Sequence, residues 1–315
     1  MNIIVKIRQF GGNLQMAHQT QRHLSKWVFF VSLIAVFMLL AACSAPVTPA
    51  TQPDTAPSAA PPPAAVPFVP LPTLAGGPPG AVAPEALEAS MVQFVSEGFT
   101  IKAYQARPKS GGSFPGLIII HENRGMTDHV KDVARRYANQ GYVTLAVDLL
   151  SRSGGSDQFP VAEAATDAIG KLNADGITQD LDAAVRYIKT LPFVKADRIG
   201  VIGYCWGGGN SLRFATNSKE LRAAVVYYGP NPTNLDVVAN VTASVLGLYG
   251  EEDTRISVNV PKLAEAMQKY GKSFEYKIYP GAAHAFFNDT GARYHPESSA
   301  DAWTRTVAFL DKNLK

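Results

Sequence analysis

The chain has 315 residues, of which 46% are hydrophobic and 17% are charged; this length supports one folded domain of about 200 to 250 residues with appendages, rather than two full domains. The formal net charge is +3, and several basic residues lie ahead of the first long apolar run. The rest of the chain is therefore nearly neutral, which gives no electrostatic case for nucleic-acid binding. The chain has two cysteines, and because a separate role is predicted for each below, we expect no disulfide.

An apolar run over residues 27–42 follows a short basic stretch and ends in the sequence LAAC at Cys43. This pattern is typical of a lipoprotein signal peptide over residues 1–42, with Cys43 as the lipid attachment site. The run is shorter than the roughly 20 apolar residues of a membrane-spanning helix, although an uncleaved N-terminal anchor is the alternative interpretation. Met16 would give a signal peptide of more ordinary length than Met1. We expect an exported protein, lipid-anchored at the cell membrane and facing the periplasm or the exterior.

Residues 43–84 are rich in proline and alanine and carry thirteen of the 22 prolines of the chain. Such a segment cannot bury enough apolar surface to offset its conformational entropy, and its prolines favour extended conformations. We therefore predict a disordered tether over residues 43–84 and a folded domain over residues 85–315.

Eight segments after the tether have the length and residue types of β-strands. They are residues 91–95, 100–106, 116–121, 143–148, 198–203, 223–228, 244–249 and 274–279. A short turn at Glu97 and Gly98 joins the first two segments, which predicts an antiparallel pair.

Helical patterns separate most of the later strand segments. They are residues 130–139, 178–190, 208–216, 258–270 and 300–313. This alternation predicts parallel strands, and the inner segments are apolar on both faces, as in a sheet that helices cover on both sides. The sequence therefore predicts a single α/β domain with a doubly wound, mostly parallel sheet.

The segment over residues 198–209 reads RIGVIGYCWGGG, a strand that runs through Gly-x-Cys-x-Gly into a helix. This is the pattern of a nucleophile elbow, in which glycines permit a sharp turn that exposes the central side chain. Cys205 lies in that central position, at a helix N-terminus where the helix dipole favours a thiolate. Cys205 is therefore the candidate nucleophile, and a buried structural cysteine beside a glycine-rich turn is the alternative.

An acid and a histidine should follow such a nucleophile in the chain, in that order. Asp253 comes just after one strand segment in the sequence VLGLYGEEDTRI, and His284 comes just after the next in YPGAAHAFF. These two residues are the candidate orienting acid and general base. Competing acids are Glu251 and Glu252, and competing histidines are His121 and His295.

The motifs GYCWGG, GEED and GAAHAF together resemble the dienelactone hydrolase (carboxymethylenebutenolidase) family, from about residue 91 to the C-terminus. The resemblance implies an α/β-hydrolase that cleaves a carboxylic ester or lactone without a cofactor. It implies Cys205 as nucleophile, His284 as base and Asp253 as acid. No clustered Cys or His spacing predicts a metal site.

The resemblance also assigns a role to Glu122, which follows the third strand segment. In the family a glutamate in this position hydrogen-bonds the resting thiol, and substrate binding moves the carboxylate so that the thiolate forms only when it is needed. The alternative is a loop carboxylate that pairs with Arg124. The fold further predicts an oxyanion hole from the backbone N–H groups of Asn123 and Trp206.

Arg152 matches a D-L-x-x-R motif of the family members specific for dienelactone, and it is a candidate substrate-binding clamp for a carboxylate. A solvated loop arginine is the alternative. Those members have a second arginine four residues after the catalytic histidine, where this chain has Asn288. Arg293 could replace it from the same loop. The missing arginine makes dienelactone itself a doubtful substrate.

Two other classes of function are compatible with the sequence. One is a substrate-binding or scaffold lipoprotein with a vestigial hydrolase site, although none of the three predicted catalytic residues is missing. The other is an acyl-transferase or peptidase on the same fold, since a fold does not dictate its substrate. The sequence predicts no oligomeric state.

Overall fold

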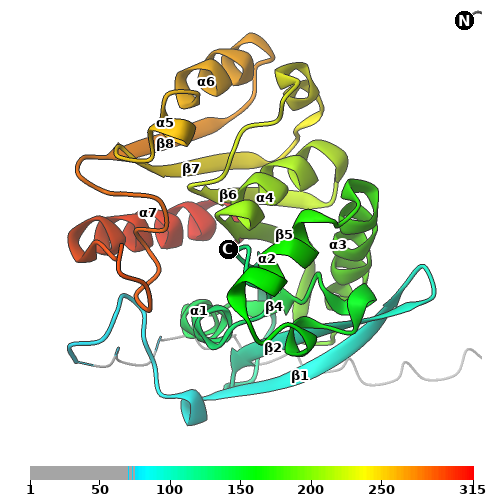
Figure 1. Cartoon of the computed structure of the whole chain (residues 1–315). Helices are drawn as coiled ribbons and strands as arrows, with labels where there is room; N and C mark the ends of the chain where they lie inside the picture. The colour runs from blue at the N-terminus through cyan, green and yellow to red at the C-terminus, as the bar shows by residue number, and fades with distance from the viewer. Residues whose placement is uncertain (1–69, 71–72, 74) are drawn as a thin grey trace, which may run out of the picture. The chain divides into compact units, whose positions relative to one another are not determined.

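The computed structural model describes residues 70, 73 and 75–315. The predicted signal peptide, Cys43 and most of the predicted tether lie outside these residues. The described residues form one eight-stranded sheet in the order β1-β2-β4-β3-β5-β6-β7-β8 (Figure 1). The strands are β1 (Leu87–Ser96), β2 (Phe99–Pro108), β3 (Phe114–Ile120), β4 (Val143–Val147), β5 (Val194–Tyr204), β6 (Leu221–Tyr227), β7 (Ser244–Gly250) and β8 (Phe274–Tyr279).

The sheet begins with an antiparallel hairpin and is otherwise mostly parallel. β1 pairs with β2, and β2 with β4, in antiparallel register. The remaining neighbours, from β4 through β3 to β8, are all parallel. The predicted doubly wound, mostly parallel sheet is thus confirmed, as is the antiparallel opening pair.

Helices cover both faces of the sheet. They are α1 (Asp128–Ala138), α2 (Ala162–Gly170), α3 (Ala174–Lys189), α4 (Trp206–Asn217), α5 (Thr254–Ser257), α6 (Val260–Lys269) and α7 (Pro296–Leu314). One buried cluster joins apolar side chains of α3, α4 and α6 to alternate sheet residues such as Ile118 and Val201. The other joins α1 and α7 to the opposite alternate set, such as Ile119 and Ile202. Every residue of β3 and β4 is buried, as their continuous apolar sequences predict.

Two helices, α2 and α5, differ from the sequence prediction. Helix α2 buries only Ala165 and Ile169, so its apolar periodicity is weak. Helix α5 is a single turn of four residues directly after Asp253. Short helices of this kind leave little pattern in a sequence.

Packing against the domain begins before residue 85. Ala81 and Val82 are buried, with 5% and 4% of their surface exposed. Val82 shares a small apolar cluster with Leu87, and a Cβ on Gly80 would lie 2.2 Å from the Trp303 ring of α7. The last residues of the predicted tether therefore belong to the packed body.

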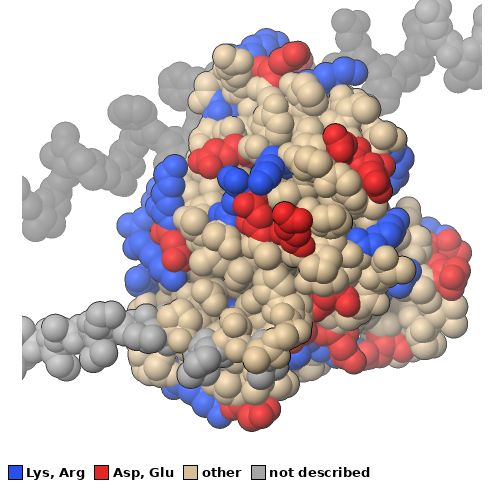
Figure 2. Space-filling view, turned by 90° about the vertical axis from the view of Figure 1, so that its left-hand side faces the viewer, with Lys and Arg blue, Asp and Glu red and all other residues tan. Residues whose placement is uncertain are grey.

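Charges of both signs are interspersed on the surface. Figure 2 shows Lys and Arg side chains mixed with Asp and Glu side chains on the face that lies to the left in Figure 1. No single sign dominates the face shown, in keeping with a nearly neutral body.

Candidate active site

Cys205 lies at a sharp turn between β5 and α4. Its backbone has φ 57° and ψ −121°, a conformation that residues other than glycine rarely adopt. A Cβ at Gly203 would lie 1.9 Å from the carbonyl oxygen of Gly207, and a Cβ at Gly207 would lie 2.3 Å from that of His121. The turn therefore requires glycine on both sides of Cys205, which is the geometry of a nucleophile elbow.

The structure brings the three predicted catalytic side chains into one hydrogen-bonded row. Nε2 of His284 lies 3.0 Å from Sγ of Cys205, and Nδ1 of His284 lies 2.5 Å from Oδ2 of Asp253. The three residues follow the carboxyl ends of β5, β7 and β8, which meet at the same edge of the sheet. Asp253 is buried and His284 is partly buried.

The row favours a charged histidine beside the thiol. Burial opposes the charge on His284, but hydrogen bonds to Asp253 and Cys205, with their negative charge, raise its pKa to about 9. Nε2 of His284, 3.0 Å from Sγ of Cys205, lies within proton-transfer distance of the thiol. The arrangement can therefore supply a nucleophile, a base for its proton, and an acid that orients the base.

The competing acids have other positions. Glu251 is exposed and accepts a hydrogen bond from the backbone N–H of Gly281 at 3.2 Å. Glu252 is also exposed. Of the three consecutive acids, it is therefore Asp253 that contacts the histidine.

The competing histidines also have structural contacts. Nε2 of His121 accepts from the backbone N–H of Leu149 at 3.2 Å, and burial lowers its pKa, so it is held as a neutral side chain in the core. His295 is the N-cap of α7, where its Nδ1 accepts from the backbone N–H of Ser298 at 3.3 Å.

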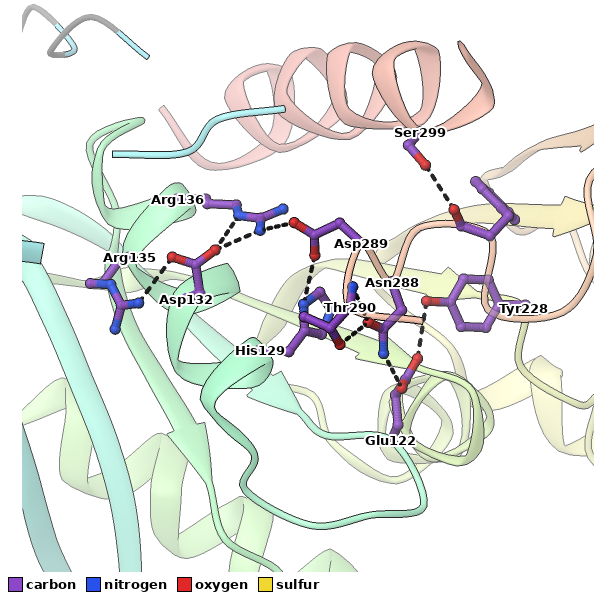
Figure 3. Close-up of polar contacts among 11 residues, drawn as sticks. Glu122, His129, Asp132, Arg135, Arg136, Tyr228, Asn288, Asp289, Thr290 and Ser299 are labelled. Atoms are coloured by element: carbon purple, nitrogen blue, oxygen red, sulfur yellow. Dashed lines mark hydrogen bonds and ion pairs between the residues drawn. The ribbon is translucent and has the colours of Figure 1, made fainter. Parts of the chain in front are cut away.

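Glu122 differs from the resting arrangement that the resemblance implies. Its Oε1 accepts from the hydroxyl of Tyr228 at 3.2 Å, and its Oε2 accepts from Nδ2 of Asn288 at 2.8 Å (Figure 3). Both oxygens are thus occupied by neutral donors, neither of them on Arg124, while the partner of the thiol is His284. The carboxylate is held beside the catalytic row instead of on the thiol.

Tyr228 is a site residue that the sequence analysis missed. It follows β6 directly, is fully buried, and has φ 39°. Its hydroxyl donates to Glu122, and its ring packs edge-on against His284 with centroids 5.2 Å apart. A bulky residue with positive φ is strained, and such strain clusters at functional sites. The only sequence signal was its place at the end of a strand beside the elbow.

Arg152 does not extend freely into the site. Its Nε donates to both carboxylate oxygens of the buried Asp180 on α3, at 3.1 and 3.0 Å, and its Nη2 donates to one of them at 2.8 Å. Its guanidinium also stacks over the Phe99 ring. This arginine is paired within the protein, and its role as a carboxylate clamp stays a prediction. Arg293, the other candidate, is exposed.

The backbone around the elbow offers donors for an oxyanion. Trp206 is the first residue of α4, and the first N–H groups of a helix have no partner within it. Asn123 follows β3, and the Trp206 ring stacks on the neighbouring His121 with centroids 5.6 Å apart. Among residues 70, 73 and 75–315, no group of three or more His, Cys, Asp or Glu is arranged to hold a metal ion.

Comparison with known proteins decides the family. The model of the dienelactone hydrolase family matches residues 101–314. The chain belongs to this family. It is therefore a hydrolase with the α/β-hydrolase fold.

Individual members of the family are similar over most of their length. "Putative carboxymethylenebutenolidase" of Methylorubrum extorquens is 34% identical, covering 70% of this chain and 79% of its own. "Probable 2-oxo-3-(5-oxofuran-2-ylidene)propanoate lactonase" of a Bradyrhizobium species is 33% identical, covering 74% and 98%. A solved structure from Klebsiella pneumoniae, described as a dienelactone hydrolase, has 30% identity and a TM-score of 0.68, covering 72% and 99%.

Proposed function

We propose that this protein hydrolyses a carboxylic ester or lactone with Cys205 as nucleophile, His284 as base and Asp253 as orienting acid. The observation that carries the proposal is the hydrogen-bonded row from thiol to imidazole to carboxylate, placed at a strained elbow. Membership of a hydrolase family supports it.

The chemistry follows from this row. The thiolate of Cys205 attacks the carbonyl carbon, and the backbone N–H groups of Trp206 and Asn123 stabilise the oxyanion that forms. Collapse of the tetrahedral intermediate breaks the ester C–O bond, and the His284 imidazolium gives its proton to the leaving alkoxide. His284 then takes a proton from water, which attacks the thioester and releases the acid and the thiolate.

The substrate is proposed to be a neutral ester or lactone. The names of the relatives favour an enol-lactone, but a carboxylate on the substrate needs a cation to bind it. Here Arg152 is paired with Asp180, and the position of the second arginine is occupied by the neutral Asn288. These two features disfavour acidic substrates.

A substrate panel tests the proposal. Protein comprising residues 75–315 is assayed against p-nitrophenyl esters of increasing acyl length, neutral lactones and lactones that carry a carboxylate. We expect turnover of neutral substrates, faster than that of acidic ones, and none by the Cys205→Ala variant. Equal turnover by the Cys205→Ala variant would refute the assignment of Cys205 as the nucleophile. Faster turnover of acidic lactones would refute the substrate class.

We also propose that the protein is exported and held at a membrane through a lipidated Cys43. The support is the LAAC sequence behind a basic and apolar segment, which lies outside the described residues. Among the described residues, no helix combines the length and apolar character needed to cross a membrane. Mass spectrometry of the detergent-extracted protein tests the proposal, with a diacylated Cys43 expected at the N-terminus. Peptides from upstream of Cys43 still attached to the mature chain would contradict it.

A further inference from the structure

The loop that follows His284 is tied to α1 by a buried ionic contact. Asp289 lies five residues beyond His284, and its Oδ2 accepts from Nη2 of Arg136 at 2.6 Å (Figure 3). Its Oδ1 lies 2.9 Å from Nδ1 of His129, although the two atoms are not aligned as a hydrogen bond. Only 2% of Arg136 is exposed.

The contact continues through α1 to β2. Nε of Arg136 donates to Oδ2 of Asp132 at 2.7 Å, and the other oxygen of Asp132 accepts from Nη2 of Arg135 at 2.9 Å. Arg135 in turn donates to the hydroxyl of Tyr104 on β2 at 3.1 Å. Arg136 is the member of this group that reaches the catalytic loop, whereas Arg135 reaches only toward β2.

The residue next to Asp289 holds Glu122. Nδ2 of Asn288 donates to Glu122 at 2.8 Å, and its Oδ1 accepts from both the backbone N–H and the hydroxyl of Thr290. Asn288 and Asp289 therefore extend from adjacent positions to two different targets, Glu122 and α1, as Figure 3 shows. The two side chains share one stretch of backbone, so a displacement of that backbone changes both contacts.

The loop is also fixed closer to His284. The carbonyl oxygen of Phe286 accepts from Oγ of Ser299 on α7 at 2.9 Å and from the backbone N–H of His295 at 2.9 Å. Besides the hydrogen bonds of His284 and Asn288, the segment 284–290 is attached to α7 at Phe286 and to α1 at Asp289. Phe287 is also buried, with its ring stacked near those of Tyr204 on β5 and Trp303 on α7. The contact of Asp289 with α1 is the attachment that lies beyond Asn288 in the chain.

A buried arginine is a costly way to hold a loop. Removing one partner of a buried ion pair is strongly destabilising, whereas apolar residues of similar volume often pack as well or better. Nη1 of Arg136 is buried without a hydrogen-bond partner among the described residues, which adds to the cost. The benefit of the contact is its defined geometry. The guanidinium of Arg136 fixes the position of the Asp289 carboxylate and thereby that of the neighbouring Asn288.

We propose that Arg136, through Asp289, is a positioning residue of the catalytic loop, which keeps Asn288 in the place where it holds the Glu122 carboxylate away from the Cys205 thiol. Arg136 contacts neither the thiol nor the histidine, so it acts only through Asp289. The inference rests on the proposed function of Cys205 as nucleophile.

The proposal predicts how the thiol responds when the attachment is lost. A freed Asn288 releases Glu122, whose carboxylate then lies next to Cys205 and repels a thiolate. The loop also carries His284, whose pairing with the thiol weakens as the loop gains freedom. The groups near the thiol are His284, with Asp253 behind it, and Tyr228, whose hydroxyl donates to Glu122. Each change lowers the thiolate fraction at neutral pH.

The test is the pH dependence of Cys205 alkylation by iodoacetamide in the full chain, measured by mass spectrometry of the peptide that contains Cys205. We expect Asp289→Ala to raise the pH of half-maximal alkylation by half a unit or more. Asp289→Asn keeps an oxygen that can accept from Arg136, and we expect less than half of that shift. Arg135→Met removes an equal charge from the adjacent residue without touching Asp289, and we expect no shift.

The alkylation profile and the midpoint of thermal unfolding together distinguish a positioning role of the Arg136–Asp289 contact from a contribution to the stability of the fold alone. An unchanged alkylation profile in Asp289→Ala with a lowered midpoint of thermal unfolding would overturn the proposal, as would an equal shift in Arg135→Met. If Asp289→Ala does not fold, Arg136→Lys, which keeps the charge but loses one arm of the guanidinium, must show a shift in the same direction. The alkylation assay needs no turnover, so its result stays readable even if the proposed hydrolysis fails in the substrate panel.

Discussion

The thiol of Cys205 has a histidine as its hydrogen-bond partner, and this pairing determines what a serine would do in its place. A hydroxyl is far less acidic than a thiol, so His284 would have to remove its proton during the attack itself. We expect Cys205→Ser to lower kcat a hundredfold or more, about 3 kcal/mol of barrier, with a smaller change in KM. Steady-state kinetics on the best p-nitrophenyl ester measure this. Cys205→Ala is the control, folded but inactive; a serine variant with more than a tenth of the wild-type kcat would contradict the prediction.

The same pairing predicts how a bound ligand affects the thiol. Nε2 of His284 already lies 3.0 Å from the thiol, so a proton acceptor for Cys205 is in place without any movement of Glu122. The substrate-driven switch at Glu122 that the family resemblance implies stays a prediction. We expect iodoacetamide to alkylate the resting enzyme at neutral pH, and a non-hydrolysable substrate analogue to slow the reaction at least fivefold. Faster alkylation in the presence of the analogue would instead support the mechanism in which substrate binding moves the Glu122 carboxylate.

At the scale of single residues, motif spacing was enough to select Cys205, Asp253 and His284, which the structure places in contact. The partners of Glu122 and Arg152 were beyond the sequence. Asn288 is 166 residues from Glu122 in the chain, and Asp180 lies one turn or more inside a helix whose face could not be aligned with Arg152 beforehand. Such pairings depend on how elements pack, which no local pattern records.

At the scale of elements, the junction of β5 and α4 tolerates no added atom. A methyl group at Gly203 would meet backbone atoms of the following helix turn, which cannot rotate away as a side chain could. We expect Gly203→Ala to lower the free energy of unfolding by more than about 3 kcal/mol, or to prevent folding. Gly111→Ala is the matched control: nothing lies within 4 Å of the added carbon, and the expected change is within about 0.5 kcal/mol. Urea unfolding followed by tryptophan fluorescence compares the two, and a similar small effect at both sites would contradict the elbow geometry.

The strands and helices were largely predictable because most of them bury a full apolar face. Each of the eight strand segments matches a strand of the sheet, and five helical patterns match α1, α3, α4, α6 and α7. Ends were less predictable than interiors: β1 starts four residues earlier than its apolar pattern, at Leu87, because pairing with β2 continues through exposed positions. Backbone hydrogen bonding extends an element where hydrophobicity gives no signal.

At the scale of the whole molecule, the boundary between tether and domain can be measured. Ala81 and Val82 are buried although they lie in the proline-rich segment, and full burial of a valine side chain contributes about 1.5–3 kcal/mol. We expect a protein of residues 75–315 to be more stable than one of residues 85–315 by about 2 kcal/mol, with the same kcat for both. Urea unfolding and ester hydrolysis measure the pair. Equal stability would mean that residues 80–82 contribute nothing to the body, and loss of activity on shortening would mean that they support the site.

The single thiol of the folded domain has a chemical consequence for the lifetime of the enzyme. Residues 75–315 contain Cys205 and no other cysteine, and a lipidated Cys43 would have its sulfur locked in a thioether. A thiolate oxidised to sulfenic acid can be rescued when a neighbouring cysteine condenses with it; without that partner it must react with a thiol from another molecule before it is oxidised further to the irreversible sulfinic acid. In an oxidising compartment this hydrolase would therefore depend on reductant from another molecule, and each catalytic centre would have a finite working life set by that supply rather than by unfolding.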